Sequence, residues 1–310
     1  MDLILKNATL KDSPGTPVDI GIADGRIAAM DPGLSADARV IELAGRLVSP
    51  GFVETHIHLD KSCILDRCGN ASDLDAAIAD VAALKKGFTV DDVYQRACRT
   101  VEKCILQGTT HMRTHLEVDP AVDLRSFEAV QQVVADYRWA IDIEICAFPQ
   151  EGLLNYPGTD ELLVAAMKKG ADSIGAAPYV DTDPHGQIDR IFELALEYDV
   201  DIDMHLDFGT DISALDLDYV CELTEKFGRG GRVAIGHVTK LAHVSPERLI
   251  ASAKRMADVG VALTVLPSTD LFLMGRDRYH GHTRGVTRAH ELLGHGVNCS
   301  LSSNNVLNPF

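Results

Sequence analysis

The sequence lacks the segments that mark secreted and membrane proteins. Its start, MDLILKNATLKD, has no long apolar run after a basic stretch, so we expect no signal peptide. No segment reaches about 18 uninterrupted apolar residues, the length expected of a membrane span. The 7 cysteines are scattered, odd in number and free of CxxC pairs, which fits reduced thiols better than a disulfide framework. We therefore expect a cytoplasmic protein.

Several catalytic signatures are missing too. There is no GxSxG nucleophile elbow, no GxxxxGK(S/T) phosphate loop and no GxGxxG dinucleotide motif. Without a PCxxC motif, the zinc deaminase fold with an HxE signature does not apply. Positive charge is scarce, since 46 acidic residues outnumber 29 basic ones and the net charge is −17. Such a surface repels nucleic acid and anionic membranes, so we expect a small-molecule partner and leave homo-oligomerisation open.

The residues that are present indicate a large core with a small attachment. The chain has 310 residues, of which 46% are hydrophobic, enough for one large core plus a satellite. Short apolar runs near the start flank Asp24-Gly25, a strong hairpin turn. We predict a small, partial, β-sandwich-like domain over residues 1–47 and a larger domain over residues 48–310.

In the larger domain, apolar strand candidates alternate with amphipathic segments. The strand candidates are Gly51–His58, Thr109–His115, Ile141–Phe148, Ser173–Pro178, Ile202–Leu206, Val233–Val238, Ala262–Leu266 and Val297–Ser303. Helical periodicity is found in Asp73–Lys86, Val90–Leu106, Leu124–Tyr137, Asp160–Lys169, Ile188–Tyr198, Leu217–Phe227, Pro246–Val259 and Thr287–Gly294. Eight strands alternating with helices predict an α/β fold, a (β/α)8 TIM-like barrel, rather than an open sheet.

Histidines occupy the ends of three predicted strands. The first strand ends in His56-Ile57-His58, and residues i and i+2 of a strand point to the same side. The fifth strand ends with His205 and the sixth with His237, at the C-terminal strand ends where barrel active sites form. Neutral imidazoles suit a divalent transition metal such as zinc or iron. A lone strand histidine is usually a hydrogen-bonded core residue, but histidines at three strand ends favour a functional site.

These motifs resemble a known family. The stretch SPGFVETHIHLDK, residues 49–61, is similar to the first barrel strand of the cytosine-deaminase-like branch of the amidohydrolase superfamily. The similarity continues at RTHLEVDP (113–120), FPQEG (148–152), HLD (205–207), GHVTKLA (236–242), LPSTDLFLMGR (266–276) and NNVLNPF (304–310), and includes the opening β segment. The resemblance implies a metal-dependent hydrolase that cleaves a C–N bond, other than a peptide bond, in a small heterocyclic or amide substrate.

The resemblance also implies roles for individual residues. His56, His58 and His205 would hold one divalent transition metal, zinc or iron, whose bound water becomes the nucleophile. His237 would polarise the substrate or stabilise developing charge. Gln150 would hydrogen-bond the amide-like edge of a heterocycle.

Two positions depart from the family's pattern. Deaminases of this branch have a metal-binding aspartate after the eighth strand, where this chain has Asn304. An amide can bind a metal through its oxygen, but it cannot act as a carboxylate base. The family's proton-shuttling glutamate is replaced by Phe208. Both changes argue against cytosine as the substrate, and they make His237 and Asp207 the candidate acid–base residues, with Asp207 alternatively orienting a histidine.

Three neighbouring features keep two interpretations each. Asp60 and Lys61 either shape the site or pair with each other on a loop. Arg113 and His115 either reach the pocket or form a buried structural pair. The apolar segment Leu271–Gly275 either forms a wall or lid of the pocket or packs as ordinary core.

Two functional hypotheses from different classes follow. The first is an active hydrolase or deaminase. The second is a catalytically lapsed barrel that acts as a small-molecule binding protein, and Asn304 is the residue that separates the two. The sequence stops at Phe310, just after the eighth strand. The resemblance leads us to expect a final helix and further strands there, so the C-terminal part of the fold is expected to be missing.

Overall fold

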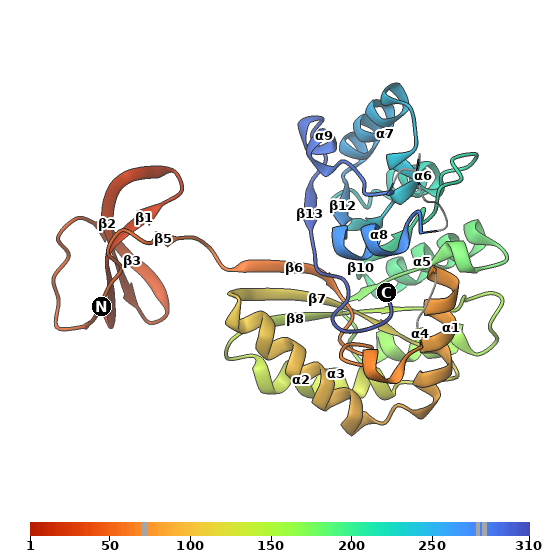
Figure 1. The fold of residues 1–310 in the computed structure, drawn as a ribbon, viewed down its shortest axis with the longest axis horizontal. Helices are drawn as coiled ribbons and strands as arrows, with labels where there is room; N and C mark the ends of the chain where they lie inside the picture. The colour runs from red at the N-terminus through yellow and green to blue at the C-terminus, as the bar shows by residue number, and fades with distance from the viewer. Residues whose placement is uncertain (70–72, 277–279, 281–283) are drawn as a thin grey trace. The chain divides into compact units, whose positions relative to one another are not determined.

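The polypeptide divides after Gly51 into two units, Met1–Gly51 and Phe52–Phe310. Both are drawn in Figure 1. The structure is a computed structural model that describes residues 1–69, 73–276, 280 and 284–310. Within these residues, no helix combines the length and the apolar character needed to cross a membrane.

The first unit is a five-stranded sheet with the order β3-β2-β1-β4, in which β5 pairs with β1. Asp24 and Gly25 join β2 to β3 with φ values of 50° and 71°, the left-handed conformation that a two-residue hairpin turn requires. The predicted N-terminal β unit is confirmed. The strands are β1 (Leu3–Leu10), β2 (Ser13–Ala23), β3 (Arg26–Asp31), β4 (Arg39–Glu42) and β5 (Leu47–Val48).

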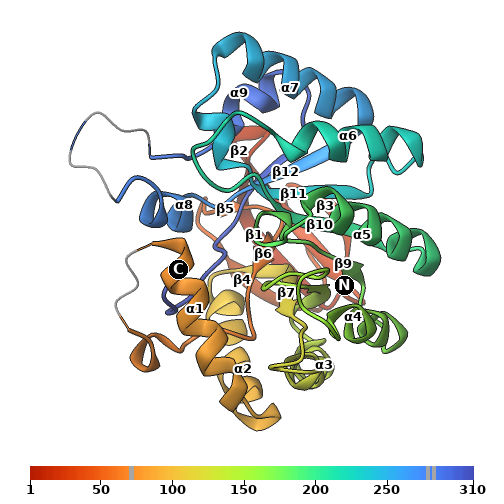
Figure 2. The same ribbon diagram turned by 90° about the vertical axis from the view of Figure 1, so that its right-hand side faces the viewer.

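The second unit is an eight-stranded parallel sheet whose strand order follows the chain from β6 to β13. This sequential order, with helices between the strands, is that of a (β/α)8 barrel, as predicted. Figure 2 shows the helices around the strands. The strands are β6 (Phe52–Ile57), β7 (Thr109–Glu117), β8 (Asp142–Phe148), β9 (Ser173–Ile174), β10 (Asp201–Leu206), β11 (Val233–His237), β12 (Val261–Val265) and β13 (Cys299–Leu301).

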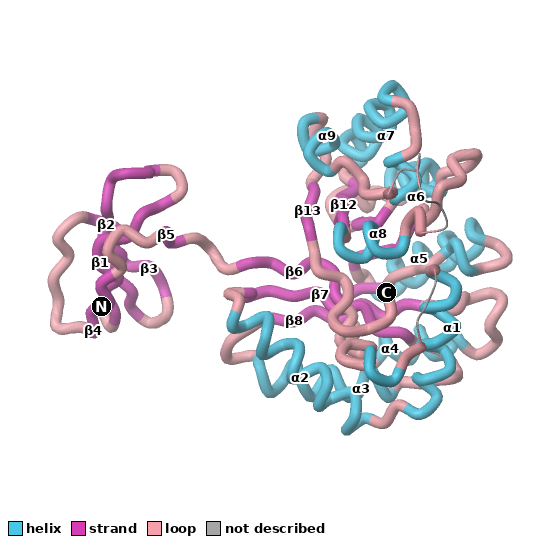
Figure 3. Tube along the Cα trace, in the orientation of Figure 1, coloured by secondary structure: helices cyan, strands magenta, loops and turns pink. Residues whose placement is uncertain are grey.

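Each predicted helical segment contains a helix, and α2 and α7 have the predicted bounds, whereas α8 was not predicted. Both begin at a side-chain cap, because Thr89 accepts a hydrogen bond from the Asp92 amide and Ser245 accepts one from the Arg248 amide. Figure 3 distinguishes helices from strands. The helices are α1 (Leu74–Leu84), α2 (Val90–Leu106), α3 (Arg125–Tyr137), α4 (Thr159–Lys168), α5 (Pro184–Tyr198), α6 (Asp216–Lys226), α7 (Pro246–Val259), α8 (Pro267–Leu273) and α9 (Ala289–Gly294), with 3-10 turns η1 (Leu65–Arg67), η2 (Lys85–Gly87), η3 (Pro178–Val180) and η4 (Thr239–Ala242).

Strand β9 is shorter than predicted. It ends at Ile174 instead of reaching Pro178. A Cβ atom on Gly175 would lie 2.6 Å from the Asp203 carbonyl oxygen, so the chain passes its neighbour too closely there for any other residue. Pro178 has no amide hydrogen to give to a sheet and begins η3 instead.

Contacts between β6 and the segment after β13 close the barrel. The Glu54 carboxylate accepts a hydrogen bond from the Ser303 amide at 2.9 Å. Two backbone hydrogen bonds follow. The backbone N–H of Asn304 donates to the backbone oxygen of His56 at 2.9 Å, and the backbone N–H of His58 donates to the backbone oxygen of Asn304 at 3.0 Å. Barrel closure therefore positions the backbone of both histidines and of Asn304.

Replacing Glu54 with Ala is expected to lower the free energy of unfolding by about 1–2 kcal/mol, because hydrogen bonds to a buried carboxylate are lost at this closure. The measurement is chemical denaturation. Glu225→Ala is the control, since the Glu225 side chain is 65% exposed and pairs with Arg255 at the surface, an interaction worth less than about 1 kcal/mol. Equal losses in the two variants would contradict the importance of the closure.

Candidate functional site

Three histidines meet at the C-terminal ends of β6 and β10. The Nε2 atom of His205 lies 3.1 Å from the Nε2 atom of His56 and 3.1 Å from that of His58. All three side chains are buried, with at most 3% exposure. Gly236 of β11 makes room for the His56 ring, because a Cβ atom there would lie 3.2 Å from two ring atoms. The structure thus brings the three predicted ligands together.

These rings are held in the neutral form that can bind a metal. His58 Nδ1 donates to the His115 carbonyl oxygen at 3.1 Å, which leaves the His58 Nε2 atom unprotonated. Burial lowers the pKa of His56, His58 and His205 well below the ordinary 6.5, and neighbouring basic groups lower it further. A neutral imidazole has one N–H, so the three facing nitrogens cannot all satisfy one another. A cation bound between the rings would accept the unshared lone pairs of these nitrogens.

Asn304 brings an oxygen donor to the same place. The residue is 2% exposed and lines the same cavity as His58 and His205. Its φ of 60° is left-handed, a conformation that asparagine tolerates better than most residues. Among the residues that the structure describes, none gives a hydrogen bond to its buried Oδ1 atom. A buried carboxamide oxygen without a partner fits a metal ligand.

His237 joins the cluster from β11. One of its ring nitrogens lies within 4.8 Å of ring nitrogens of His56 and His205. Its Nδ1 atom donates to Asp270 Oδ1 at 2.6 Å, and Asp270, in α8, is fully buried. Sequence reasoning missed Asp270. The available signal was its place four residues after Leu266, just beyond the seventh predicted strand.

The cluster borders a cavity of about 20 Å³, which holds about one water molecule. A heterocyclic substrate therefore requires side chains of the lining to move. A larger cavity of about 660 Å³ lies at the opposite, N-terminal ends of the barrel strands, and its described lining contains none of the predicted ligand, catalytic or substrate residues. The described lining of the small cavity is His58, Lys61, Leu74, Gln150, Tyr179, His205, Phe208, His237, Thr269, Leu273, Asn304, Asn305 and Phe310.

Gln150 and Lys61 both face this cavity. The Gln150 Oε1 atom accepts a hydrogen bond from Lys61 Nζ at 3.3 Å. The Lys61 ammonium also donates to Glu117 at 2.8 Å and lies 4.3 Å from the centre of the Phe310 ring. The Asp60 carboxylate instead accepts from the backbone amides of Lys61 and Glu117. Lys61 therefore lines the cavity, whereas Asp60 binds the backbone beside it.

The Asp207 carboxylate lies at the start of α6. Its carboxylate accepts from the amides of Asp216 at 3.0 Å and Leu217 at 2.9 Å, and it pairs with Lys240 at 3.2 Å. A carboxylate at the start of a helix satisfies free amides and interacts favourably with the helix dipole. Both oxygens are therefore engaged at α6, and the geometry favours neither predicted role for Asp207.

His115 and Arg113 form a buried arrangement around Asp203. The His115 ring stacks on the His56 ring with 3.8 Å between centroids. Its Nε2 atom lies 3.4 Å from one Asp203 oxygen, and Arg113 donates to the other at 3.0 Å. Burial alone would lower the pKa of His115, but Cys146 and Asp203 raise it to about 10. The structural interpretation of this pair is supported, with His115 packed behind a predicted ligand.

The segment Leu271–Gly275 contributes Leu273 to the cavity wall, and the two residues before Leu273 lie at the surface. Leu273 lines the cavity, whereas the side chains of Leu271 and Phe272 are 46% and 45% exposed. Phe208, in the position of the family's glutamate, also lines the cavity, with its ring 5.2 Å from that of His237. Apolar groups thus cover part of the cavity beside the histidines.

Comparison with known proteins places the chain among hydrolases. Residues 89–310 match the model of the amidohydrolase family. N-isopropylammelide isopropyl amidohydrolase of Pseudomonas sp. (strain ADP) is 30% identical over 270 residues, 84% of this chain and 66% of that protein. Pterin deaminase of Rhizobium rhizogenes is 29% identical over 303 residues, 94% of this chain and 68% of that protein. The chain spans about two thirds of the length of these curated relatives.

A solved structure agrees over nearly the whole chain. The crystal structure of 5-methylcytosine deaminase from Klebsiella pneumoniae, liganded with 5-fluorocytosine, has a TM-score of 0.93 and 28% identity. The match covers 99% of this chain and 76% of that one. Because the family model matches more than half of its residues, the chain belongs to the amidohydrolase family.

Proposed function

We propose that this protein is a metal-dependent hydrolase that cleaves a C–N bond, other than a peptide bond, in a small nitrogen heterocycle or amide. The observation that carries the proposal is the set of buried Nε2 atoms, with His205 3.1 Å from both His56 and His58. The family supports the same reaction class, as do relatives named as an amidohydrolase and as deaminases.

The proposed ligands are His56, His58, His205 and Asn304, which hold one zinc or iron ion. Three neutral imidazoles and an amide oxygen form a nitrogen and oxygen donor set that suits either metal. When bound, the metal lowers the pKa of a coordinated water and so supplies a nucleophile at neutral pH.

His237 is the proposed acid–base residue. Asp270 accepts the hydrogen of its Nδ1 atom at 2.6 Å, which leaves Nε2 to take a proton from the attacking water or to stabilise charge on the substrate. His237 would thus replace the aspartate base that Asn304 cannot supply.

The proposed substrates are amino-substituted nitrogen heterocycles. The names of the relatives refer to N-isopropylammelide, pterin and 5-methylcytosine. Gln150 would bind the ring edge. Lys61 occupies its Oε1 atom and the Tyr179 hydroxyl is a partner of its side chain, so one N–H of the amide is left for a carbonyl oxygen or ring nitrogen. Phe208 would supply an apolar contact to the ring.

Because Asn304 replaces a carboxylate, a second candidate function is small-molecule binding without catalysis. A barrel that keeps the histidines and the cavity but lacks the carboxylate would bind a small heterocycle without hydrolysing it. The test that separates the two is metal analysis followed by assays of ammonia or amine release from amino-substituted pyrimidines, pterins and triazines. Release by the wild type supports the hydrolase, and binding without release supports the binding protein. Failure to take up metal on reconstitution would contradict the hydrolase.

Replacing Asn304 with Asp is expected to tighten metal binding roughly tenfold or more, because a carboxylate beside the ion adds on the order of a few kcal/mol. The measurement is competition with a chelator. Asn298→Asp is the matched control, since Asn298 lines the cavity at the other end of the barrel. Equal tightening in both variants would remove Asn304 from the metal site. An inactive wild type together with an active Asn304→Asp variant would establish the lapsed hydrolase.

His237→Ala is expected to lower kcat by about 10²–10⁴-fold, the usual contribution of general acid–base catalysis, while the metal content is retained. Asp207→Ala is expected to lower the free energy of unfolding by about 1 kcal/mol through the loss of the α6 cap, with a much smaller change in kcat. Steady-state kinetics and thermal denaturation of both variants provide the comparison. The reverse pattern would assign the acid–base role to Asp207 instead.

A further inference from the structure

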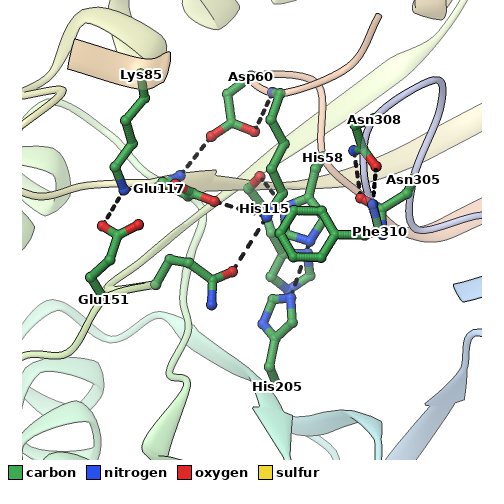
Figure 4. A network of polar contacts seen from close by, with 12 residues as sticks. His58, Asp60, Lys85, His115, Glu117, Glu151, His205, Asn305, Asn308 and Phe310 are labelled. Carbon is green, nitrogen blue, oxygen red and sulfur yellow. Dashed lines mark hydrogen bonds and ion pairs between the residues drawn. The ribbon is translucent and has the colours of Figure 1, made fainter. Parts of the chain in front are cut away.

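A buried cluster of charges lies behind the cavity, and the described lining of the cavity includes none of its members. Lys85, in η2, is 1% exposed. Its ammonium donates to Glu117 at 2.8 Å, to Asp119 at 2.5 Å and to Glu151. Oxygens of the three carboxylates lie within 4.8 Å of one another, and Lys85 supplies the cation that such a group attracts. Figure 4 shows Lys85 and Glu151 on one side of Glu117 and His58 on the other.

Glu117 connects this cluster to the cavity. It is the last residue of β7, and its two carboxylate oxygens accept from Lys85 and Lys61, each at 2.8 Å. Lys61 in turn donates to the Gln150 Oε1 atom at 3.3 Å. An ammonium group has hydrogens to donate and no lone pair, so Lys61 determines which end of the Gln150 amide faces it.

Lys85 reaches the same loop by a second route. Its contact with Glu151 lies one residue from Gln150 in the chain. The loop after β8 is therefore held at two adjacent residues, directly through Glu151 and indirectly through Glu117 and Lys61.

The ionisation of these groups agrees with this arrangement. Burial opposes the charge of Lys85, but Glu117, Glu151 and Asp119 outweigh it and raise the pKa of Lys85. Burial likewise opposes the charge of Glu117, but Lys61 and Lys85 lower its pKa to about 2. Burial and the neighbouring Glu117 raise the pKa of Glu151 to about 9. At neutral pH, Lys85 and Glu117 form a fully ionised pair away from solvent.

We propose that Lys85 is a positioning residue for substrate recognition, an inference that rests on the proposed function. Lys85 holds Glu117 from behind, Glu117 holds Lys61, and Lys61 orients the Gln150 amide. Beside its contact with Tyr179, the amide then presents its remaining N–H to an acceptor atom of the substrate. Lys85 acts through this chain of contacts and touches neither the substrate nor the histidine cluster.

Lys85→Met tests the proposal. For a heterocycle with a carbonyl at the recognised edge, KM is expected to rise about five- to tenfold, the effect of losing roughly one hydrogen bond, while kcat changes less than about twofold. Metal content is expected to stay unchanged. The control is Arg229→Met, which removes another buried cation, one that pairs with Asp199 at 3.1 Å. It is expected to lower stability without raising KM. An unchanged KM in Lys85→Met, or an equal rise in the control, would overturn the proposal.

A double-mutant cycle separates positioning through Gln150 from a general effect on folding. In the Gln150→Ala background, Lys85→Met is expected to change KM less than about twofold, because coupled residues are not additive. Lys85→Arg keeps the charge and is expected to recover most of the wild-type KM. Full additivity would refute the chain of contacts. If Lys85→Met does not fold, Glu117→Gln makes the same test, because an amide offers only one oxygen to the two ammonium groups.

The crystal structure of Lys85→Met decides the inference even if the wild type hydrolyses nothing. We expect the Glu117 carboxylate to turn and the contact between Lys61 Nζ and Gln150 Oε1 to be lost. An unchanged contact would overturn the proposal. By contrast, a wild type that takes up no metal and releases no ammonia would contradict the proposed function and leave this structural result standing.

Discussion

The close approach of three buried imidazole nitrogens is the constraint on which the site depends. Nitrogen atoms of neutral rings 3.1 Å apart present more lone pairs than N–H groups, and burial keeps the rings from relieving this by taking up protons. Residues around them accommodate the arrangement. Gly236 leaves space for the His56 ring, and the closure of the barrel fixes the backbone of Asn304 beside it. These features have a common explanation if a cation is bound among the rings.

Buried carboxylates lie beside the basic groups around this centre. Asp270 accepts a hydrogen bond from the His237 ring, and Glu117 accepts one from Lys61. Asp203 lies 3.4 Å from the His115 ring that stacks on His56, and it accepts a hydrogen bond from Arg113. In each case the carboxylate is buried and paired with a donor, as burial of a charge requires. Lys85 extends this principle one step further from the cavity, because it holds a carboxylate that in turn holds a lysine.

The barrel was predictable from the sequence because strands buried on both faces leave apolar runs, and histidines at their C-terminal ends mark the site. The histidine pair of β6 followed from the two-residue period of a strand. The partners of the buried basic groups were harder to predict from the sequence, because they are distant along the chain. Asp270 lies 33 residues from His237, and Glu117 lies 32 residues from Lys85. Asp207 showed the opposite problem: its place beside a histidine suggested catalysis, but its carboxylate caps α6.

X-ray absorption spectroscopy of the zinc-loaded protein tests most directly whether His56, His58, His205 and Asn304 hold one ion. We expect three imidazole nitrogens at about 2.0–2.1 Å and at least one oxygen at roughly 2.0–2.2 Å, with one imidazole fewer in His205→Ala. A sulfur shell at about 2.3 Å, or a spectrum without an imidazole contribution, would contradict this metal site.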